Sequence, residues 1–353
     1  MGGASSSKAT AATDPLLFVR QDLEKIGGHL TKLVEKRESP VLHMAGQHLL
    51  SNPGKMVRPG LVCLLAYCAL PAEEALTLHA RNREGEYELP TDVVAPGSHF
   101  HRQLRLAEVT ELIHTASLIH DDILDDATLR RGRPAVHTVH GTKVAVLAGD
   151  FLLARASHWI ATLRCSEVVV RMTRALEDLT SGEILQSTGV YDVPTYMQKT
   201  YCKTASLLDN SLASVAILSA GETSPYVAHA SAFGRHLGIA FQIVDDCLDF
   251  TETQESLGKP PHNDLRSGIA TLPVLLAAEK DDGVAIRMRR SFREEGDVPY
   301  VIEAVERYKT VPIAQERAWK EYEMAMNAIK QLHWSPARDV LDSAAAYVLT
   351  RTS

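Results

Sequence analysis

The chain has 353 residues, a formal net charge of −7 at pH 7 and a hydrophobic content of 45%. This content is enough to build a large core, so the composition excludes a chain that is disordered over most of its length. The negative charge argues against nucleic acid as the main partner, because phosphate backbones are held by dense Lys and Arg surfaces. Five scattered cysteines without a CxxC pair predict small core residues in a reducing compartment and no zinc site.

Residues 1–13 are rich in Ala, Ser, Gly and Thr, which is typical of a disordered tail. The opening Met1-Gly2 fits the pattern of N-myristoylation, but the tail has no arginine and shows no clear targeting signal. We expect no apolar run long enough to span a bilayer, and hence a soluble protein.

From residue 14 onward, apolar residues recur at helical spacing, without the sustained alternation that strands show. The sequence therefore predicts an all-α fold in one domain, residues 14–353. Residues 71–100 lack helical periodicity and are expected to form a polar insertion loop at the surface. The expected helices span 15–36, 39–51, 57–69, 101–125, 142–163, 166–188, 196–220, 227–249, 270–281, 298–306, 311–331 and 336–350.

Two aspartate clusters with matching spacing, DDILD at 121–125 and DDCLD at 245–249, each lie inside an apolar stretch. Residues i and i+4 are neighbours on a helix, so each cluster presents a pair of carboxylates on one face. Mg²⁺ binds a few carboxylate oxygens and completes its coordination with water and substrate phosphate. We expect the clusters to form facing walls of one metal-diphosphate cavity. For either cluster alone, a solvated acidic helix end remains the alternative.

Basic residues accompany the aspartates. Arg130 and Arg131 follow the first cluster at the expected end of its helix, where planar guanidinium groups can hold phosphates. Lys55 and Arg58 lie three residues apart where a turn opens a helix, which favours an anion without a metal. The alternatives are a helix C-terminus stabilised by cations and a basic surface loop. Five further polar residues in apolar settings are candidate ligand contacts: His114, Lys203, Thr204, Gln242 and Lys259.

Six segments, in this order, resemble the signature set of the trans-prenyl diphosphate synthases, also called polyprenyl synthetases. They are GKMVRP, LIHDDILDDATLRRGRPAVH, AGDFLLARA, KTASL, FQIVDDCLDF and GKPPHNDLRSGIATLPVLLA. The resemblance runs from about residue 14 to the C-terminus. It implies a helical barrel of the isoprenoid-synthase type around a deep central cavity, usually in a homodimer, with a hetero-oligomer as the alternative.

The resemblance also implies a role for each motif residue. Three Mg²⁺ ions would be held by Asp121, Asp125 and Asp245, with Asp122 and Asp249 supporting them at the metal site. Isopentenyl diphosphate would be bound by Lys55, Arg58, His114 and Arg131. The allylic diphosphate would be surrounded by Arg130, Lys203, Thr204, Gln242 and Lys259. The residues expected to act in catalysis are Asp121, Asp122, Asp125, Lys203 and Asp245.

The expected reaction is ionisation of the allylic diphosphate followed by attack of the isopentenyl double bond on the cation, with no protein nucleophile. Ala116 and Ser117 are small residues one turn before Asp121, so the cavity should accept a long tail. We therefore expect a long-chain polyprenyl diphosphate, built on farnesyl or geranylgeranyl diphosphate, for a quinone such as ubiquinone.

Three other readings remain open: a short-chain farnesyl or geranylgeranyl synthase, a class I terpene cyclase, and a non-catalytic partner subunit. Quinone synthesis favours a mitochondrion or another organelle with delivery of the product to a membrane, and the cytoplasm is the alternative. The sequence does not specify the product length or the primer.

Overall fold

A computed structural model describes residue 14 and residues 16–35, 54–83, 99–251, 261–332 and 335–350. The expected N-terminal tail, the expected helix at 39–51 and Lys259 lie outside the described residues.

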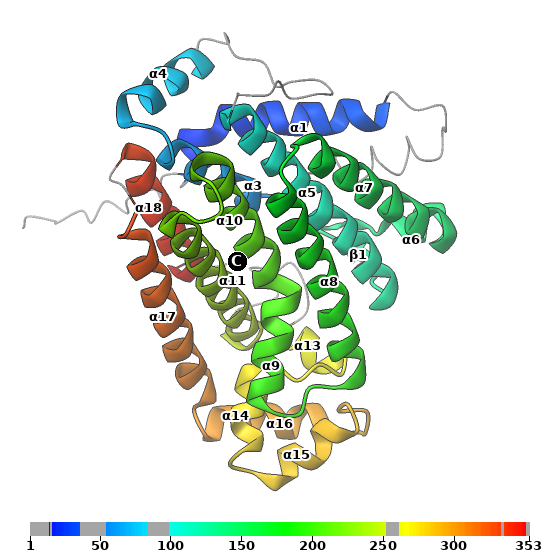
Figure 1. Ribbon diagram of the computed structural model, residues 1–353. Helices are drawn as coiled ribbons and strands as arrows, with labels where there is room; N and C mark the ends of the chain where they lie inside the picture. The colour runs from blue at the N-terminus through cyan, green and yellow to red at the C-terminus, as the bar shows by residue number, and fades with distance from the viewer. Residues whose placement is uncertain are drawn as a thin grey trace, which may run out of the picture.

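Helices make up almost all of the described chain, as the sequence predicts (Figure 1). The elements up to the second aspartate cluster are η1 (Leu17–Val19), α1 (Arg20–Glu35), α3 (Val57–Cys68), α4 (Ala72–Arg83), α5 (His99–Leu124), β1 (Leu129–Arg130), β2 (Arg133–Pro134), α6 (Val136–His140), α7 (Thr142–Thr162), α8 (Ser166–Thr188), α9 (Val193–Thr200), η2 (Tyr201–Ala205) and α10 (Ser206–Ala220). The cluster itself lies on α11, and the later elements follow it: α11 (Pro225–Thr251), α13 (Asn263–Arg266), α14 (Leu272–Ala278), α15 (Asp282–Arg289), α16 (Asp297–Arg307), α17 (Thr310–Ile329) and α18 (Pro336–Thr350).

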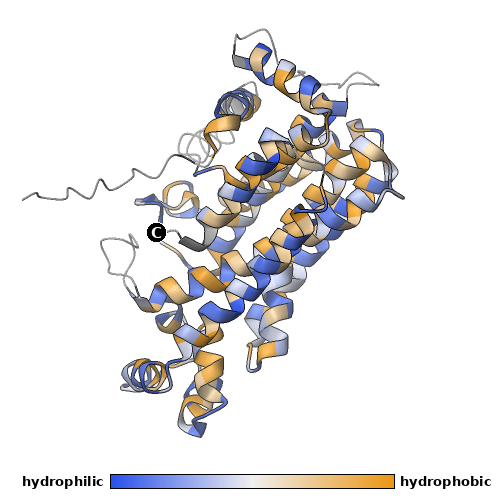
Figure 2. Cartoon of the chain, turned by 90° about the vertical axis from the view of Figure 1, so that its left-hand side faces the viewer, coloured by the Kyte–Doolittle hydropathy of each residue, from blue (hydrophilic) through white to orange (hydrophobic). Residues whose placement is uncertain are grey.

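The helices α3 and α10 form the centre of the bundle. Residues 59–68 of α3 and 206–218 of α10 are all buried, and the polar side chains that α10 buries, such as Asp209 and Asn210, are hydrogen-bonded. The helices α5, α8 and α11 pack against α10, while α7 covers α5 and α17 covers α11. In Figure 1, α1 crosses one end of the bundle and α14 to α16 lie at the other. Hydrophilic and hydrophobic residues alternate along most outer helices, as amphipathic elements require (Figure 2).

The structure corrects the expected elements in two places. The loop expected at 71–100 was wrong for residues 72–83, where Ala, Leu and Glu, which are good helix formers, build α4. The single helix expected at 196–220 is interrupted by η2, a π-helical turn between α9 and α10. The short helices α6, α13 and α15 were not predicted, because four to eight residues carry too little periodicity.

Helix α7 is long and apolar enough, by length and composition, to cross a membrane, so the expectation that no segment would be was wrong. The helix packs along α5, and Trp159 and Ile160 are buried in the core. Its other side leaves Leu147 52% exposed. The apolar residues of α7 are therefore those of a helix that packs in the bundle on one side and is exposed on the other.

A buried ion pair joins three helices in the first half of α5. Arg105 and Glu108 are both 0% exposed, and Nη1 of Arg105 lies 3.0 Å from Oε2 of Glu108. The other carboxylate oxygen lies 2.5 Å from Nδ1 of His29 on α1. The Arg105 guanidinium stacks 4.2 Å from the centre of the Trp159 ring on α7. These contacts fix α1 and α7 on α5.

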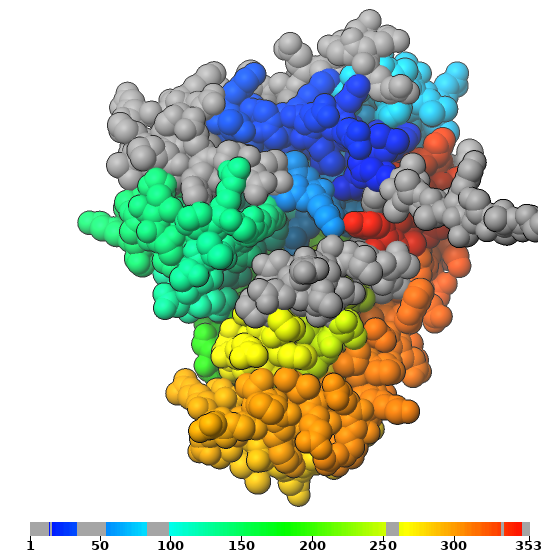
Figure 3. Space-filling model, turned by 180° about the vertical axis from the view of Figure 1, so that it is seen from behind, coloured from blue at the N-terminus to red at the C-terminus, as the bar shows by residue number. Residues whose placement is uncertain are grey.

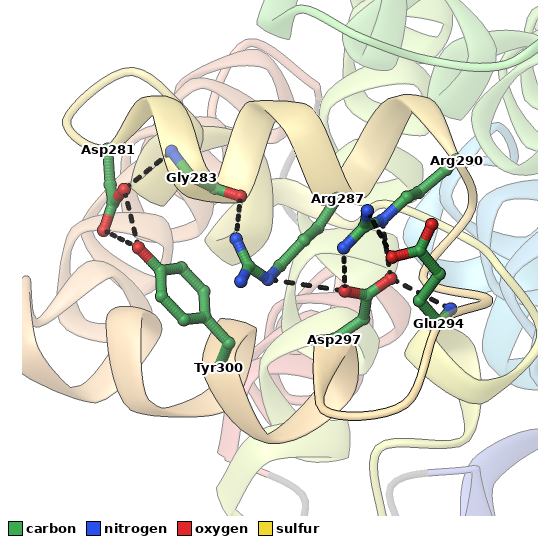
Figure 4. A network of polar contacts seen from close by, with 7 residues as sticks. All are labelled: Asp281, Gly283, Arg287, Arg290, Glu294, Asp297 and Tyr300. Carbon is green, nitrogen blue, oxygen red and sulfur yellow. Dashed lines mark hydrogen bonds and ion pairs between the residues drawn. The ribbon is translucent and has the colours of Figure 1, made fainter.

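A second polar network holds α15 against α16 (Figure 4). The Asp297 carboxylate accepts hydrogen bonds from Nε and Nη2 of Arg290 at 2.9 and 2.5 Å, and its side chain is almost fully buried. Arg287 also approaches Asp297, at 3.4 Å, and its guanidinium covers the Tyr300 ring. The Tyr300 hydroxyl donates to Asp281, the residue that caps α15. The Arg290 pair lowers the pKa of Asp297.

Candidate active site

A cavity of about 410 Å³ lies at the start of α3. Its apolar part is formed by side chains of α3, α10 and α11, including Leu61, Leu208 and Phe241. Its polar part contains all four residues expected to bind isopentenyl diphosphate, together with two others: Lys55, Arg58, His114, Arg131, Glu111 and Thr204. Residues separated by more than 70 positions in the sequence thus meet in one place.

Arg131 reaches the cavity from a hairpin and not from a helix end. Helix α5 ends at Leu124, and β1 and β2 follow with Arg130 paired to Arg133. The two turn residues, Arg131 and Gly132, have φ of 50° and 73°, the left-handed values of a tight two-residue hairpin turn. The guanidinium of Arg131 packs so closely on Gly54 that a Cβ there would collide with it.

Arg58 and His114 form a directed pair. Nη1 of Arg58 lies 3.0 Å from Nε2 of His114, and a guanidinium can only donate, so Nε2 accepts and the ring proton is on Nδ1. Burial lowers the pKa of His114 well below its usual value, and the charges of Arg58, Arg131 and Arg130 lower it further. His114 is therefore neutral at pH 7 and adds no positive charge.

Glu111 was missed by the sequence reasoning. Burial raises the pKa of its carboxyl, while Arg58 and Arg131 oppose this shift. Glu111 is thus an acidic residue among the basic residues Lys55, Arg58 and Arg131 that line the cavity. Its only sequence signal is its position three residues before His114, on the same face of α5.

Lys55 is exposed and contacts the C-terminal helix. Its Nζ donates a hydrogen bond of 3.1 Å to the Tyr347 hydroxyl of α18. Figure 3 shows the light blue start of α3 and the red α18 side by side on the rear face. Tyr347 was also missed, because nothing local in the sequence relates it to a residue 292 positions earlier.

The first aspartate cluster lies at the end of α5. Asp121 belongs to the helix, and Asp125 is the first residue after Leu124. Burial raises the pKa of Asp121 to about 6; Lys203 opposes this shift, whereas Glu183 and Asp125 add to it. Crowded carboxylates of this kind fit a hard divalent cation, which would relieve their repulsion.

No three acidic, His or Cys side chains among the described residues form a complete metal site on their own.

Asp122 is paired with Arg130. It is 4% exposed and accepts from Nε of Arg130 at 2.8 and 3.1 Å, with a further contact from Nη2. This bidentate pair ties the hairpin to the end of α5.

The π-helical turn η2 carries Lys203 and Thr204. Lys203 forms an ion pair with Glu183 of α8, a third residue that the sequence reasoning missed. The turn packs tightly on Gly182, where a Cβ would lie 2.6 Å from Cγ of Lys203. π-Helical turns are rare and often mark functional sites. The available signal was the Gly182-Glu183 pair within an otherwise regular helix.

The three aspartates of the second cluster differ in their surroundings. Asp245 is exposed, whereas Asp246 and Asp249 are 2% and 0% exposed. The Asp249 oxygens accept the backbone N–H groups of Asn263 and Asp264, each at 3.2 Å. Asp249 thus anchors the first turn of α13, and its expected role at the metal site, like that of Asp121, Asp125 and Asp245, remains a prediction.

The family model described as polyprenyl synthetase matches residues 39–305. The chain belongs to the polyprenyl synthetase family. It is 40% identical to a prenyl transferase of Synechocystis over 94% of this chain and 96% of that protein. It is also 40% identical to solanesyl diphosphate synthase 2, chloroplastic, of Arabidopsis thaliana, over 94% of this chain and 75% of the relative.

A solved structure agrees with these relatives. The polyprenyl synthase of Caulobacter crescentus, complexed with calcium and isoprenyl diphosphate, superposes with a TM-score of 0.80 at 25% identity, over 99% of this chain and 100% of the other. The all-α fold is thus that of the polyprenyl synthetases, and the chain is a prenyltransferase.

The two residues expected to govern product length lie on the synthase's α5. Ala116 is fully buried in the main core cluster, and the Ser117 hydroxyl donates to the carbonyl of His114 at 2.9 Å. Neither lines the 410 Å³ cavity. Their influence on the product remains a prediction.

Proposed function

We propose that this prenyltransferase is a long-chain all-trans polyprenyl diphosphate synthase, which adds isopentenyl diphosphate units to an allylic diphosphate. One observation carries the proposal: Lys55, Arg58 and Arg131 line the cavity, whereas Asp121 and Lys203 form a second charged group that does not line it. Two diphosphates can therefore bind at once, one without a metal and one with it. A terpene cyclase needs only the second site.

Asp121, Asp125 and Asp245 would hold up to three Mg²⁺ ions. When bound, the metal neutralises the charge that develops on the departing diphosphate. Lys203 and Arg130 supply further positive charge beside it. Asp122 and Asp249 act indirectly, since the first fixes Arg130 and the second fixes α13.

The chain's own residues then position the second substrate. Lys55, Arg58 and Arg131 hold the isopentenyl diphosphate, and Nδ1–H of the neutral His114 is available as a donor. The apolar part of the cavity keeps water from the allylic cation. The proton lost from the adduct passes to the released diphosphate, so the protein needs no nucleophile.

A long product is supported by small residues at Ala116 and Ser117 and by the relative named as a solanesyl diphosphate synthase. Such a product suits the side chain of a quinone, such as ubiquinone, and would be passed to a membrane. Since the Arabidopsis relative is named as chloroplastic, we place the enzyme in an organelle. A fluorescent fusion of the full chain tests this location.

The decisive experiment incubates purified protein with Mg²⁺, farnesyl diphosphate or geranylgeranyl diphosphate, and labelled isopentenyl diphosphate, and then sizes the products. A long-chain synthase gives labelled polyprenyl diphosphates. Products with one or two added units would indicate a short-chain synthase. A cyclic hydrocarbon would indicate a terpene cyclase, and the absence of any product would indicate a non-catalytic partner subunit.

A homodimer is supported by the uncovered apolar face of α7 and its surroundings, which includes Leu147, Val146 and Leu129. Leu147→Asp should shift the purified protein from dimer to monomer in size-exclusion chromatography with light scattering. Ile286→Asp, at an exposed site on α15, is the matched control. A monomeric wild type would exclude the homodimer and favour a second kind of subunit.

A further inference from the structure

Three hydrogen bonds connect α9 to the π-helical turn through α11. The Tyr196 hydroxyl donates to Oδ2 of Asp246 at 2.6 Å, and Nε2 of Gln242 donates to Oδ1 of the same carboxylate at 2.9 Å. The Thr204 hydroxyl donates to Oε1 of Gln242 at 2.8 Å. Tyr196 and Asp246 are 0% and 2% exposed, so water does not compete for the bond between them.

The chain of bonds has one direction. A carboxylate accepts, so Asp246 turns the amide nitrogen of Gln242 toward itself and leaves the amide oxygen facing Thr204. The hydroxyl hydrogen of Thr204 is thereby committed to Gln242. Toward the cavity, Thr204 can offer only lone pairs, which suit a donor or a positive charge. A diphosphate oxygen is itself an acceptor and gains nothing from it.

Lys199 supplies the charge that opposes Asp246. Its side chain is 6% exposed, on the same short helix as Tyr196, and Nζ lies 5.2 Å from the centre of the Tyr196 ring. Burial lowers the pKa of Lys199, and Asp246 is the charge that opposes this most strongly. A buried carboxylate is costly without such a partner.

We propose that Tyr196, Lys199 and Asp246 form a buried positioning cluster, which orients the Gln242 amide and, through it, the acceptor side of the Thr204 hydroxyl toward the reacting allylic group. The inference rests on the proposed function, because it takes the allylic diphosphate to ionise beside the π-helical turn that carries Lys203 and Thr204, next to the cavity for isopentenyl diphosphate. The three residues act through Gln242 and not on the substrate.

Tyr196→Phe removes one bond of the cluster and tests the proposal by steady-state kinetics. We expect kcat to fall roughly tenfold, the loss of one hydrogen bond to a charged group, with the KM for isopentenyl diphosphate unchanged within about twofold. Tyr226→Phe is the matched control, since Tyr226 is on α11 and its buried hydroxyl has no hydrogen-bond partner among the described residues. Lys199→Met should also lower kcat, and Lys199→Arg should restore most of it.

The coupling is measured in a Gln242→Met background. If Tyr196 acts through Gln242, Tyr196→Phe causes no further loss there. Equal losses in both backgrounds, or an unchanged kcat of Tyr196→Phe in the wild-type background, would overturn the proposal.

Hydrogen exchange of residues 201–206 provides a readout that does not depend on turnover. Exchange should be faster in Tyr196→Phe than in Tyr226→Phe, because the turn loses a fixed partner. Equal exchange in the two variants contradicts the positioning cluster. Absence of labelled product from both the wild type and Tyr226→Phe would instead reject the proposed function.

Discussion

Arg58→Ala should weaken the binding of isopentenyl diphosphate selectively. The Arg58 guanidinium lines the cavity beside Lys55 and Arg131, donates to His114 and opposes the raised pKa of Glu111. Losing a hydrogen bond to a charged group costs about 1.5–3 kcal/mol, which raises the KM for isopentenyl diphosphate roughly 10- to 150-fold. The KM for the allylic diphosphate should change by less than about twofold, because effects at separate sites are nearly independent.

The assay varies each substrate in turn at a saturating concentration of the other. Arg307→Ala is the matched control: Arg307 pairs with Glu303 on the exposed side of α16, outside the cavity. An equal rise in both KM values would show that the two substrate sites have been exchanged in our assignment. An unchanged KM for isopentenyl diphosphate would remove Arg58 from the binding wall.

Three further outcomes are expected. Asp121→Ala should abolish turnover. Removal of divalent metal from the wild type by a chelator should do the same, but only the wild type should recover activity when Mg²⁺ is restored. A near-normal kcat of Asp121→Ala would refute the metal assignment. Ala116→Phe should shorten the product. Because Ala116 is fully buried, the substitution should also lower the free energy of unfolding by about 1–3 kcal/mol. An unchanged distribution of product lengths would show that α5 does not limit the length of the product. Asp297→Asn should lower the thermal unfolding midpoint by a few degrees at neutral pH. Arg290 lowers the pKa of Asp297 below its ordinary value of 3.8, so this stabilisation is present above pH 3.8 and is lost as the pH falls through the folded-state pKa. The unfolding midpoints of the wild type and Asp297→Asn should therefore become equal in acid. A difference between the two midpoints that does not change with pH would contradict the ion pair.

Helical periodicity predicted most of the fold. The long helices carry repeating apolar faces, and α8 and α18 begin and end where the sequence indicated. The π-helical turn could not be predicted, because one extra residue within a continuous helical segment leaves the apolar pattern almost unchanged. Helix α4 was missed because its polar residues show no clear apolar face, although their helix propensity is high.

The candidate site was predictable where chemistry is local in the sequence. The resemblance to the polyprenyl synthetases implied that Lys55, Arg58, His114 and Arg131 bind one substrate, and the structure brings them to one cavity. The residues that support them were not predictable. Glu111 looks like an ordinary helix residue, and Tyr347 approaches Lys55 only through folding.

The salt link between Arg105 and Glu108 has an evolutionary consequence. Replacing either residue alone leaves its partner's charge buried and unpaired, which lowers the free energy of unfolding by about 3–5 kcal/mol. Replacing both with aliphatic side chains of similar size is nearly neutral. Drift at these two positions should therefore be correlated. Related sequences should keep both charges or have neither, and a single exchange should be tolerated only where His29 and Trp159 have also changed.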